Sequence, residues 1–239
     1  MKQQVVNYTN DDHERWQILF NRLQGYMHLF VPEYKKGLEV LQLSSSSVPS
    51  FDDINDKLTP LTGWQYKPME GDMSYYEFLR SLANRVFHSA TQVRSRQEMN
   101  FCKLPDIFHD VFGHSGLLVC PEVATFLEQL GQIGLNHEDN PEFILRLLNI
   151  YWYTAEVGLI QRNGHILCYG GSIISSVNEI ERVYSGEVKI LPYNLERIME
   201  TPYNSFEVND QYFVISGFDE LTKSLDKIKQ MGKLEMKIQ

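Results

Sequence analysis

Two histidines in the stretch PDIFHDVFGHSGLL, residues 105 to 118, have the residue type and the setting of metal ligands. His109 and His114 lie inside an otherwise apolar run and are five residues apart. On an unbroken α-helix, five residues turn through about 500°, so the two side chains would point about 140° apart. The two imidazoles therefore converge only if the helix ends or bends between them, and Gly113 is the residue that would permit this.

Glu156, in the stretch YWYTAEVGL, is the candidate for a third ligand. Apolar residues share its face at helical spacing, namely Leu148, Trp152, Leu159 and Ile160. The carboxylate is therefore expected to be buried, where it needs a metal ion or an ion-pair partner. Two neutral imidazoles and one carboxylate form the facial triad of non-haem Fe(II) oxygenases, and the same ligand types suit catalytic zinc. The alternative is that both histidines are hydrogen-bonded core residues and Glu156 pairs with an arginine.

The spacing of the two histidines argues against a zinc peptidase. Peptidases of the HExxH type place two histidines four residues apart, with a glutamate base between them. Here the spacing is five, and the residue after His109 is Asp110. Zinc-dependent hydrolysis is therefore disfavoured.

Helices are expected to position most of these residues. Helical periodicity or helix-start signals mark residues 10–24, 74–87, 121–135 and 141–159, and the chain returns to helical spacing after residue 218. The second of these helices opens with Ser74 and Glu77, three residues apart, which is a capping box. The fourth is long and apolar, so it is expected to be central and largely buried, with Glu156 near its end.

Strand signals are few and short. Asn163-Gly164 lies between two short runs at 160–169, which predicts a hairpin, and residues 187–193 and 211–218 are rich in strand-forming residues. Strands do not alternate with helices, so a parallel α/β fold is disfavoured. The predicted fold class is a mainly α domain with a small accessory β-sheet.

Composition limits the possible partners and compartment. The 239 residues are 43% hydrophobic and 22% charged, which suits one compact domain over residues 1–239. The net charge is −9 and the lysines and arginines are scattered, so nucleic acid is not an expected partner. No 18-residue apolar stretch or signal-peptide core occurs, so no membrane association is expected. Three cysteines without a CxxC pair indicate reduced thiols in the cytoplasm.

Four blocks together resemble the pterin-dependent aromatic amino acid hydroxylases, most of all the short bacterial phenylalanine 4-hydroxylases. The blocks are FLRSLANRVFHSATQVRS, PDIFHDVFGH, IYWYTAEVGL and YGGSIISS. The likeness runs from residue 62 to about residue 228 and is weaker in the first helix. It implies the catalytic-domain fold of that family. It also implies hydroxylation of the ring of a free aromatic amino acid, phenylalanine to tyrosine, with Fe(II), tetrahydrobiopterin and O2.

The resemblance assigns roles to particular residues. The iron ligands, which are also the catalytic groups, fall on His109, His114 and Glu156. Phe78 matches the ring that stacks on the pterin, and the other cofactor positions are Gly71, Met73, His88 and Tyr151. Arg94 matches the arginine that holds the amino acid carboxylate, a task that suits a guanidinium fork. The remaining substrate positions are Cys102, Pro105, Trp152, Val157, Ser172 and Ser175.

Three departures from the family pattern bear on the substrate. Ser115-Gly116 follow the second histidine where a residue and a proline are usual, Val157 replaces a common phenylalanine, and Ser172 replaces a usual glycine. Loss of an aromatic surface at Val157 is expected to widen or reshape the pocket. The same chemistry on tryptophan, or at another ring position of phenylalanine, is therefore an alternative. A second alternative is a binding protein that keeps the fold but does not catalyse a reaction.

Longer members of the family carry a regulatory domain before the catalytic domain and a tetramerising helix after it. This chain is expected to have neither and to be a monomer.

Overall fold

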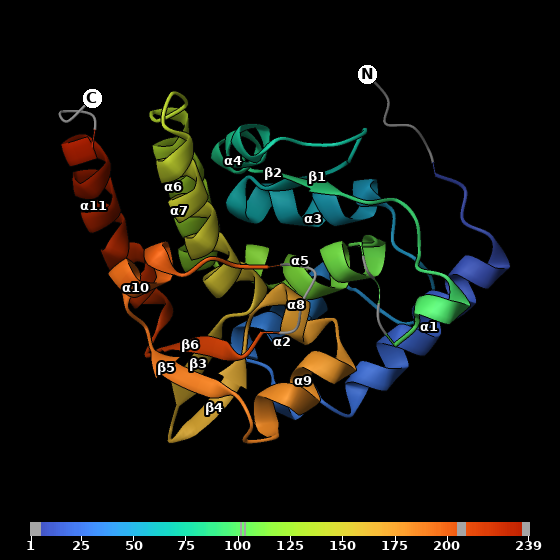
Figure 1. Ribbon diagram of the computed structural model, residues 1–239. Coiled ribbons are helices and arrows are strands. Elements are labelled where there is room, and N and C mark those ends of the chain that lie inside the picture. The colour runs from blue at the N-terminus through green and yellow to red at the C-terminus, as the bar shows by residue number, and fades with distance from the viewer. Residues whose placement is uncertain (1–5, 101, 103, 205–208, 236–239) are drawn as a thin grey trace.

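Helices make up most of the structure; of its two small sheets, the smaller lies beside α3 (Phe51–Thr62) and α4 (Tyr75–Ala83), and the larger lies at the lower edge of the view in Figure 1. The computed structural model describes residues 6–100, 102, 104–204 and 209–235. The α-helices are α1 (Asn10–Gln24), α2 (Pro32–Leu41), α3 (Phe51–Thr62), α4 (Tyr75–Ala83), α5 (His114–Leu118), α6 (Pro121–Leu135), α7 (Pro141–Tyr151), α8 (Gly171–Ile174), α9 (Val177–Tyr184), α10 (Leu195–Glu200) and α11 (Phe218–Glu235). Short 3-10 turns are η1 (Met27–Leu29) and η2 (Arg96–Glu98), and two π-helical segments are η3 (Phe108–Gly113) and η4 (Trp152–Glu156).

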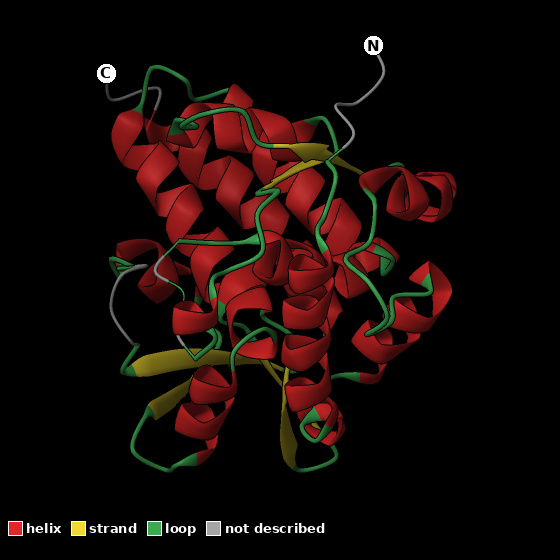
Figure 2. Cartoon of the chain, turned by 90° about the vertical axis from the view of Figure 1, so that its right-hand side faces the viewer, coloured by secondary structure: helices red, strands yellow, loops and turns green. Residues whose placement is uncertain are grey.

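The two sheets are short and lie on different sides of the helices (Figure 2). Strands β1 (Gln65–Pro68) and β2 (Val86–Ser89) form a parallel pair. The larger sheet has the order β4-β3-β6-β5, with strands β3 (Leu159–Arg162), β4 (His165–Cys168), β5 (Lys189–Pro192) and β6 (Gln211–Ile215). The predicted hairpin is confirmed: β3 and β4 are antiparallel, and Asn163 (φ 51°) and Gly164 (φ 81°) make the left-handed turn.

Helix α4 begins as predicted and ends earlier. Its capping box is present, because the Glu77 backbone N–H donates to Ser74 Oγ at 3.2 Å and the Ser74 N–H donates to Glu77 Oε2 at 2.9 Å. The prediction of helix to residue 87 was wrong. The Asn84 side chain donates to the Arg80 carbonyl at 2.7 Å and Arg85 turns left-handed with φ 55°, so the chain leaves the helix and enters β2.

The predicted helix at 141–159 also needs correction. It is α-helical to Tyr151, widens into η4 and stops at Glu156, and the following residues enter β3. The Thr154 hydroxyl donates to the Ile150 carbonyl at 2.6 Å, a back-bond of the kind that bends helices. The widened turn decides where the carboxylate of Glu156 points.

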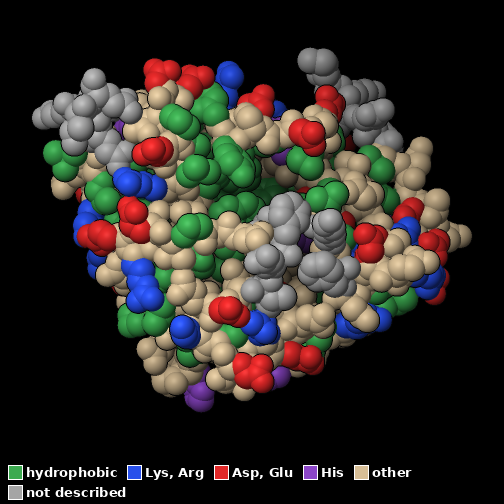
Figure 3. Space-filling view, viewed as in Figure 1, with side chains coloured by type: hydrophobic (Ala, Val, Ile, Leu, Met, Phe, Trp, Pro, Cys, Tyr) green, Lys and Arg blue, Asp and Glu red, His purple; other side chains and the backbone are tan. Residues whose placement is uncertain are grey.

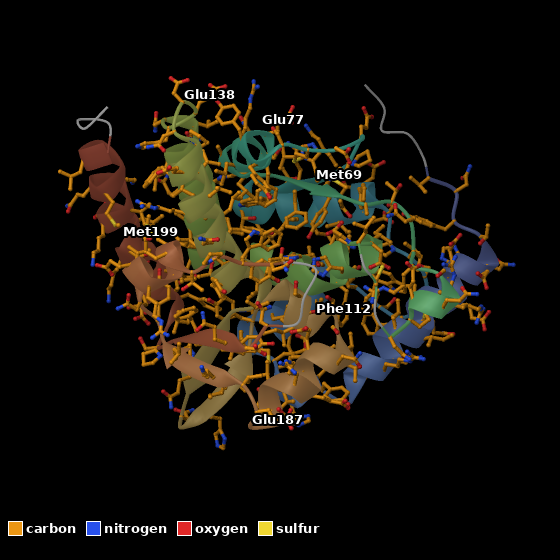
Figure 4. All side chains as sticks on the ribbon, in the orientation of Figure 1. Met69, Glu77, Phe112, Glu138, Glu187 and Met199 are labelled. Carbon is orange, nitrogen blue, oxygen red and sulfur yellow. The ribbon has the colours of Figure 1, made fainter. Side chains whose placement is uncertain are left out.

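One hydrophobic cluster runs through the whole fold, from Trp16 on α1 to Ile228 on α11. Phe112 lies near its centre (Figure 4), stacked on Phe108 at 4.7 Å and edge-on to Phe20 at 5.1 Å. Both central rings belong to η3, so the segment that carries His109 is anchored in the core on its opposite face. At the surface, hydrophobic side chains gather around a hollow near the middle of the face in Figure 3. Within the described part of the chain, no helix is both long and apolar enough to span a membrane.

Candidate metal centre

His109 and His114 converge because the helix between them widens. Segment η3 is a π-helix, whose hydrogen bonds span five residues, and its wider turn brings residues five apart onto roughly the same face. Their ring centroids are 5.1 Å apart. The regular α-helix is interrupted between the two histidines, as expected, but by the π-segment η3 and not by a special conformation of Gly113, which has ordinary helical angles (φ −68°, ψ −38°). Its small size serves packing, since a Cβ there would lie 2.6 Å from the Gly171 carbonyl oxygen.

Glu156 is brought to the two histidines by the second π-segment, η4. Its Oε1 lies 3.3 Å from His114 Nε2 and its Oε2 lies 3.5 Å from His109 Nε2. One ligand atom from each of the three residues lies within 4.8 Å of the others. Glu156 and His114 are buried, with 4% and 6% of their surfaces exposed. The predicted burial of the carboxylate is confirmed, and its neighbours are imidazoles and hydroxyls rather than an arginine.

Hydrogen bonds select the ring nitrogen that His109 offers to a metal. Ser175 Oγ lies 3.0 Å from His109 Nδ1 and donates its single proton to the Gly171 carbonyl at 2.7 Å. The serine oxygen must therefore accept from His109, which places the proton on Nδ1 and leaves a lone pair on Nε2. This is the arrangement in which a second group orients an imidazole ligand.

The charges of the cluster suit a cation. Burial lowers the pKa of His109 to about 4, so this imidazole is neutral at neutral pH. Burial opposes ionisation of Glu156, but the adjacent His114 and His109 hold its pKa well below the ordinary value. Burial raises the pKa of nearby Asp110 to about 7, and its Oδ2 accepts the Ala90 N–H at 2.7 Å. The three candidate ligands thus present one negative charge and an imidazole lone pair.

One buried nitrogen of the cluster, His114 Nε2, indicates that a metal ion would fit here. His114 Nε2 is buried and has no hydrogen-bond partner, which is costly unless another group meets it. It faces the Glu156 carboxylate at 3.3 Å. Together with His109 Nε2 these atoms are the donor set that non-haem iron(II) prefers, and zinc accepts the same ligands. The residues therefore fit a divalent transition metal.

The turn Gly170–Ser172 packs tightly on both ligand segments. A Cβ at Gly171 would overlap the imidazole of His114, and a Cβ at Gly170 would overlap the backbone of Glu156. Glycine is needed at both positions because the backbone of the turn forms one wall of the cluster. This close packing explains the two glycines of the block YGGS, which the sequence pattern alone does not explain.

We expect Gly171→Ala to weaken metal binding at least about 10-fold, because the added methyl must displace His114. The measurement is a Co(II) titration of the metal-free protein. Gly25→Ala is the matched control, since nothing lies within 4 Å of a Cβ there. Equal Co(II) affinity of the two variants would show that His114 can move aside without weakening metal binding.

Arg94 forms a buried ion pair with Asp106, next to the candidate ligand His109. Asp106 was not predicted as a site residue from the sequence. Arg94 Nε and Nη2 donate to Asp106 Oδ2 and Oδ1 at 3.0 and 2.7 Å, and the His109 N–H donates to Oδ1 at 3.0 Å. Burial opposes both charges, but pairing still raises the pKa of Arg94 and lowers that of Asp106. One carboxylate thereby fixes both the arginine and the start of η3.

Arg94 also faces a cavity of about 280 Å³ between α1 and α9. Ser175 lines the same cavity, and so do Leu19 and Leu23 of α1. Because Asp106 occupies only one edge of the guanidinium, other N–H groups can meet a ligand carboxylate. The predicted substrate residues Arg94 and Ser175 are therefore brought together.

The predicted pterin residues connect to the metal cluster through Tyr151. The Phe78 ring meets Tyr151 edge-on at 4.7 Å, and the Tyr151 hydroxyl donates to Glu156 Oε1 at 2.9 Å. His88 on β2 has a buried Nδ1 without a hydrogen-bond partner, which a ligand could satisfy. Gly71 (φ 75°) and Met73 lie in the loop before α4, and Gly71 is exposed.

The other predicted substrate residues differ in their surroundings. Val157 is 1% exposed and belongs to the hydrophobic core, while Pro105 is exposed and Cys102 is half-buried. Trp152 stacks on Tyr203 at 4.9 Å with the rings 9° from parallel. Tyr203 was not predicted, and nothing near it in the sequence marks it as a partner of Trp152. Ser172 donates to Glu156 Oε2 at 2.7 Å, so it lies against a candidate metal ligand.

Two imidazoles and one carboxylate in a buried site on a mainly α fold define a metalloprotein of the facial-triad class. Residues 2–239 match the family described as biopterin-dependent aromatic amino acid hydroxylase, and the chain belongs to this family. The resemblance inferred from the sequence blocks is thereby confirmed.

Individual relatives agree with this membership. The chain is 34% identical over 223 residues to the phenylalanine-4-hydroxylase of Ralstonia nicotianae, covering 92% of this chain and 71% of the relative. The apo structure of the cold-active phenylalanine hydroxylase from Colwellia psychrerythraea superimposes with a TM-score of 0.91 at 29% identity, covering 98% and 91% of the two chains. A second structure is the Chromobacterium violaceum phenylalanine hydroxylase with bound iron(III) and 7,8-dihydrobiopterin. Its TM-score is 0.88 at 32% identity, and the match covers 99% of this chain and 85% of that one. The predicted fold is confirmed by these likenesses.

Proposed function

We propose that this protein hydroxylates phenylalanine to tyrosine with Fe(II), a tetrahydropterin such as tetrahydrobiopterin, and O2. The main observation behind the proposal is the cluster of His109, His114 and Glu156, the last two of them buried, in a member of the biopterin-dependent hydroxylase family. The phenylalanine hydroxylases among the relatives support phenylalanine as the substrate. When bound, iron and pterin supply the electrons that activate O2 for insertion into the ring.

In this proposal the chain's own residues contribute binding and orientation. His109, His114 and Glu156 hold the metal, and Ser175 fixes the tautomer of His109. Arg94, braced by Asp106, binds the substrate carboxylate through charge-assisted hydrogen bonds. Holding both reactants next to the metal lowers the entropic part of the barrier.

The remaining predicted contacts divide between the two ligands. Gly71, Met73, Phe78, His88 and Tyr151 form the pterin side. Cys102, Pro105, Trp152, Val157, Ser172 and Ser175 form the substrate side together with Arg94. The contact of Phe78 with Tyr151, and of Tyr151 with Trp152 at 5.5 Å, supports two adjoining sites.

A product assay tests the proposal. Protein loaded anaerobically with Fe(II) is mixed with tetrahydrobiopterin and air, and separately with phenylalanine or tryptophan, and products are identified by chromatography and mass. Para-tyrosine is the expected product. A meta-hydroxylated phenylalanine would change the assigned ring position, and a hydroxylated indole would change the assigned substrate to tryptophan. If neither a product nor pterin oxidation is detected, the protein is a binding protein on this fold.

We expect Phe78→Ala to raise the KM for tetrahydrobiopterin about 10-fold, because a stacked aromatic contact contributes about 1 kcal/mol beyond its buried area. The metal content should stay unchanged. Phe51→Ala is the matched control, since Phe51 is also half-buried and stacks on Tyr66 at 6.0 Å. A larger rise in the KM for phenylalanine than for pterin would contradict the assignment of Phe78.

The proposal includes a single catalytic unit over residues 1–239 that works as a monomer in the cytoplasm. The continuous core from Trp16 to Ile228 supports one unit, and the free thiols of Cys102, Cys120 and Cys168 support a reducing compartment. Sedimentation velocity measures the mass in solution. A mass above that of one chain would contradict the monomer.

A further inference from the structure

We propose that Ser172 is a positioning residue that fixes the carboxylate of Glu156 for metal binding, in a role that rests on the proposed function. Ser172 Oγ donates to Glu156 Oε2 at 2.7 Å. The sequence resemblance placed Ser172 on the substrate side, at a position where the family usually has glycine. A glycine at this position could not make this hydrogen bond.

The two oxygens of Glu156 are held by different hydroxyls. Oε1 accepts from Tyr151 at 2.9 Å and Oε2 accepts from Ser172 at 2.7 Å. Tyr151 is five residues before Glu156 on the same helix, where the π-segment brings the two together, while Ser172 belongs to α8. The last torsion of a glutamate has no sharp rotamer wells. Two donors from separate elements therefore fix a rotation that the side chain itself leaves open.

The backbone beside Ser172 packs directly against the cluster. Gly170 is packed on the backbone of Glu156 and Gly171 on the ring of His114, so closely that a Cβ at either position would overlap its neighbour. Ser175, one turn later, bonds both His109 and the Gly171 carbonyl. The turn therefore carries the Ser172 hydroxyl at a fixed place relative to all three ligands.

The hydroxyl leaves Glu156 able to bind a metal. Each carboxylate oxygen has about two acceptor sites, so an oxygen that accepts one hydroxyl keeps a lone pair for the cation. Partners of this kind change metal affinity or activity by about 10- to 100-fold in other metal sites.

Equilibrium titration of the metal-free protein with Co(II) tests the role of Ser172, because binding and the Co(II) absorption spectrum are read without turnover. Ser172→Ala and Ser172→Gly should each raise the Kd about 10-fold and shift the Co(II) bands, with unchanged thermal stability of the metal-free form. Ser172→Thr retains the hydroxyl and should restore most of the affinity. Ser185→Ala, at the exposed end of α9, is the matched control.

Two outcomes separate this inference from the proposed function. If the parent protein binds Co(II) but both hydroxyl-free variants bind it equally well with the same spectrum, Ser172 has no positioning role and the proposed function stands. If the parent binds Co(II) no better than Glu156→Gln, the metal centre itself is wrong and both proposals fall. Weaker binding accompanied by an equal loss of thermal stability in the metal-free form would indicate a structural role and also overturn the inference.

Discussion

Glu156→Gln is expected to abolish metal retention and to lower hydroxylation at least about 10³-fold. The amide keeps the size of the side chain and can still meet the Tyr151 hydroxyl, but it removes the only carboxylate of the ligand cluster. Two imidazoles alone bind a divalent ion weakly, and a bound metal supplies several kcal/mol of rate enhancement, where each 1.36 kcal/mol is tenfold. Metal content after dialysis and product formation under saturating Fe(II) are the measurements.

Glu179→Gln serves as the matched control. Glu179 is a half-buried glutamate that, like Glu156, accepts from a tyrosine, Tyr212, at 2.9 Å, but it lies on α9 and is not one of the three candidate ligands. Its variant should keep both metal and activity. Metal retained by Glu156→Gln at the level of the Glu179 variant would show that the carboxylate is not a ligand.

Periodicity and end signals predicted much of the fold. Residues 10–24 and 121–135 are helices with the predicted bounds, because their apolar stripes and their N-terminal signals agree. The hairpin at Asn163-Gly164 is equally local, since both residues tolerate positive φ. Helices α2 and α3 were not predicted as elements, although Pro32 and the Ser50 cap mark their starts.

The ends of helices and the π-segments could not be predicted in the same way. A π-turn uses the same residue types as an α-turn, so nothing in FHDVFG distinguishes the two. In the structure Phe108 and Phe112 are held by the core while the other face meets Gly171, and this packing accompanies the widened turn. The residue types at 109, 114 and 156 identified the candidate ligands, but the geometry that joins them depends on tertiary contacts.

Partners distant in sequence were also beyond prediction. Arg94 was recognised, yet its dependence on Asp106 was not, because Asp106 reads as part of an ordinary helix start. Tyr203 and the contact of Ser172 with Glu156 are likewise products of the folded chain. Residue type suggests what chemistry a side chain can do, whereas its orientation is set by groups from other elements.

Asp106→Asn is expected to destabilise the protein by about 3–5 kcal/mol, because it leaves the Arg94 guanidinium buried without a counter-charge. Arg94 is 7% exposed and Asp106 1% exposed. The carboxylate accepts from the Arg94 side chain and backbone and from the His109 N–H, and an amide can satisfy only part of this set. The free energy of unfolding of the metal-free protein, from urea denaturation, is the measurement.

Asp11→Asn removes another aspartate paired with an arginine, Arg96, at the surface, where both side chains are about half exposed. Solvent screening weakens this surface pair, so its loss is expected to cost far less stability than the loss of Asp106. A larger loss of unfolding free energy in Asp106→Asn than in Asp11→Asn would therefore show the effect of burying the pair and not only the effect of removing a charge. If Asp106→Asn were no less stable than Asp11→Asn, Arg94 would not depend on its buried partner, and its place beside the metal ligands would need another explanation.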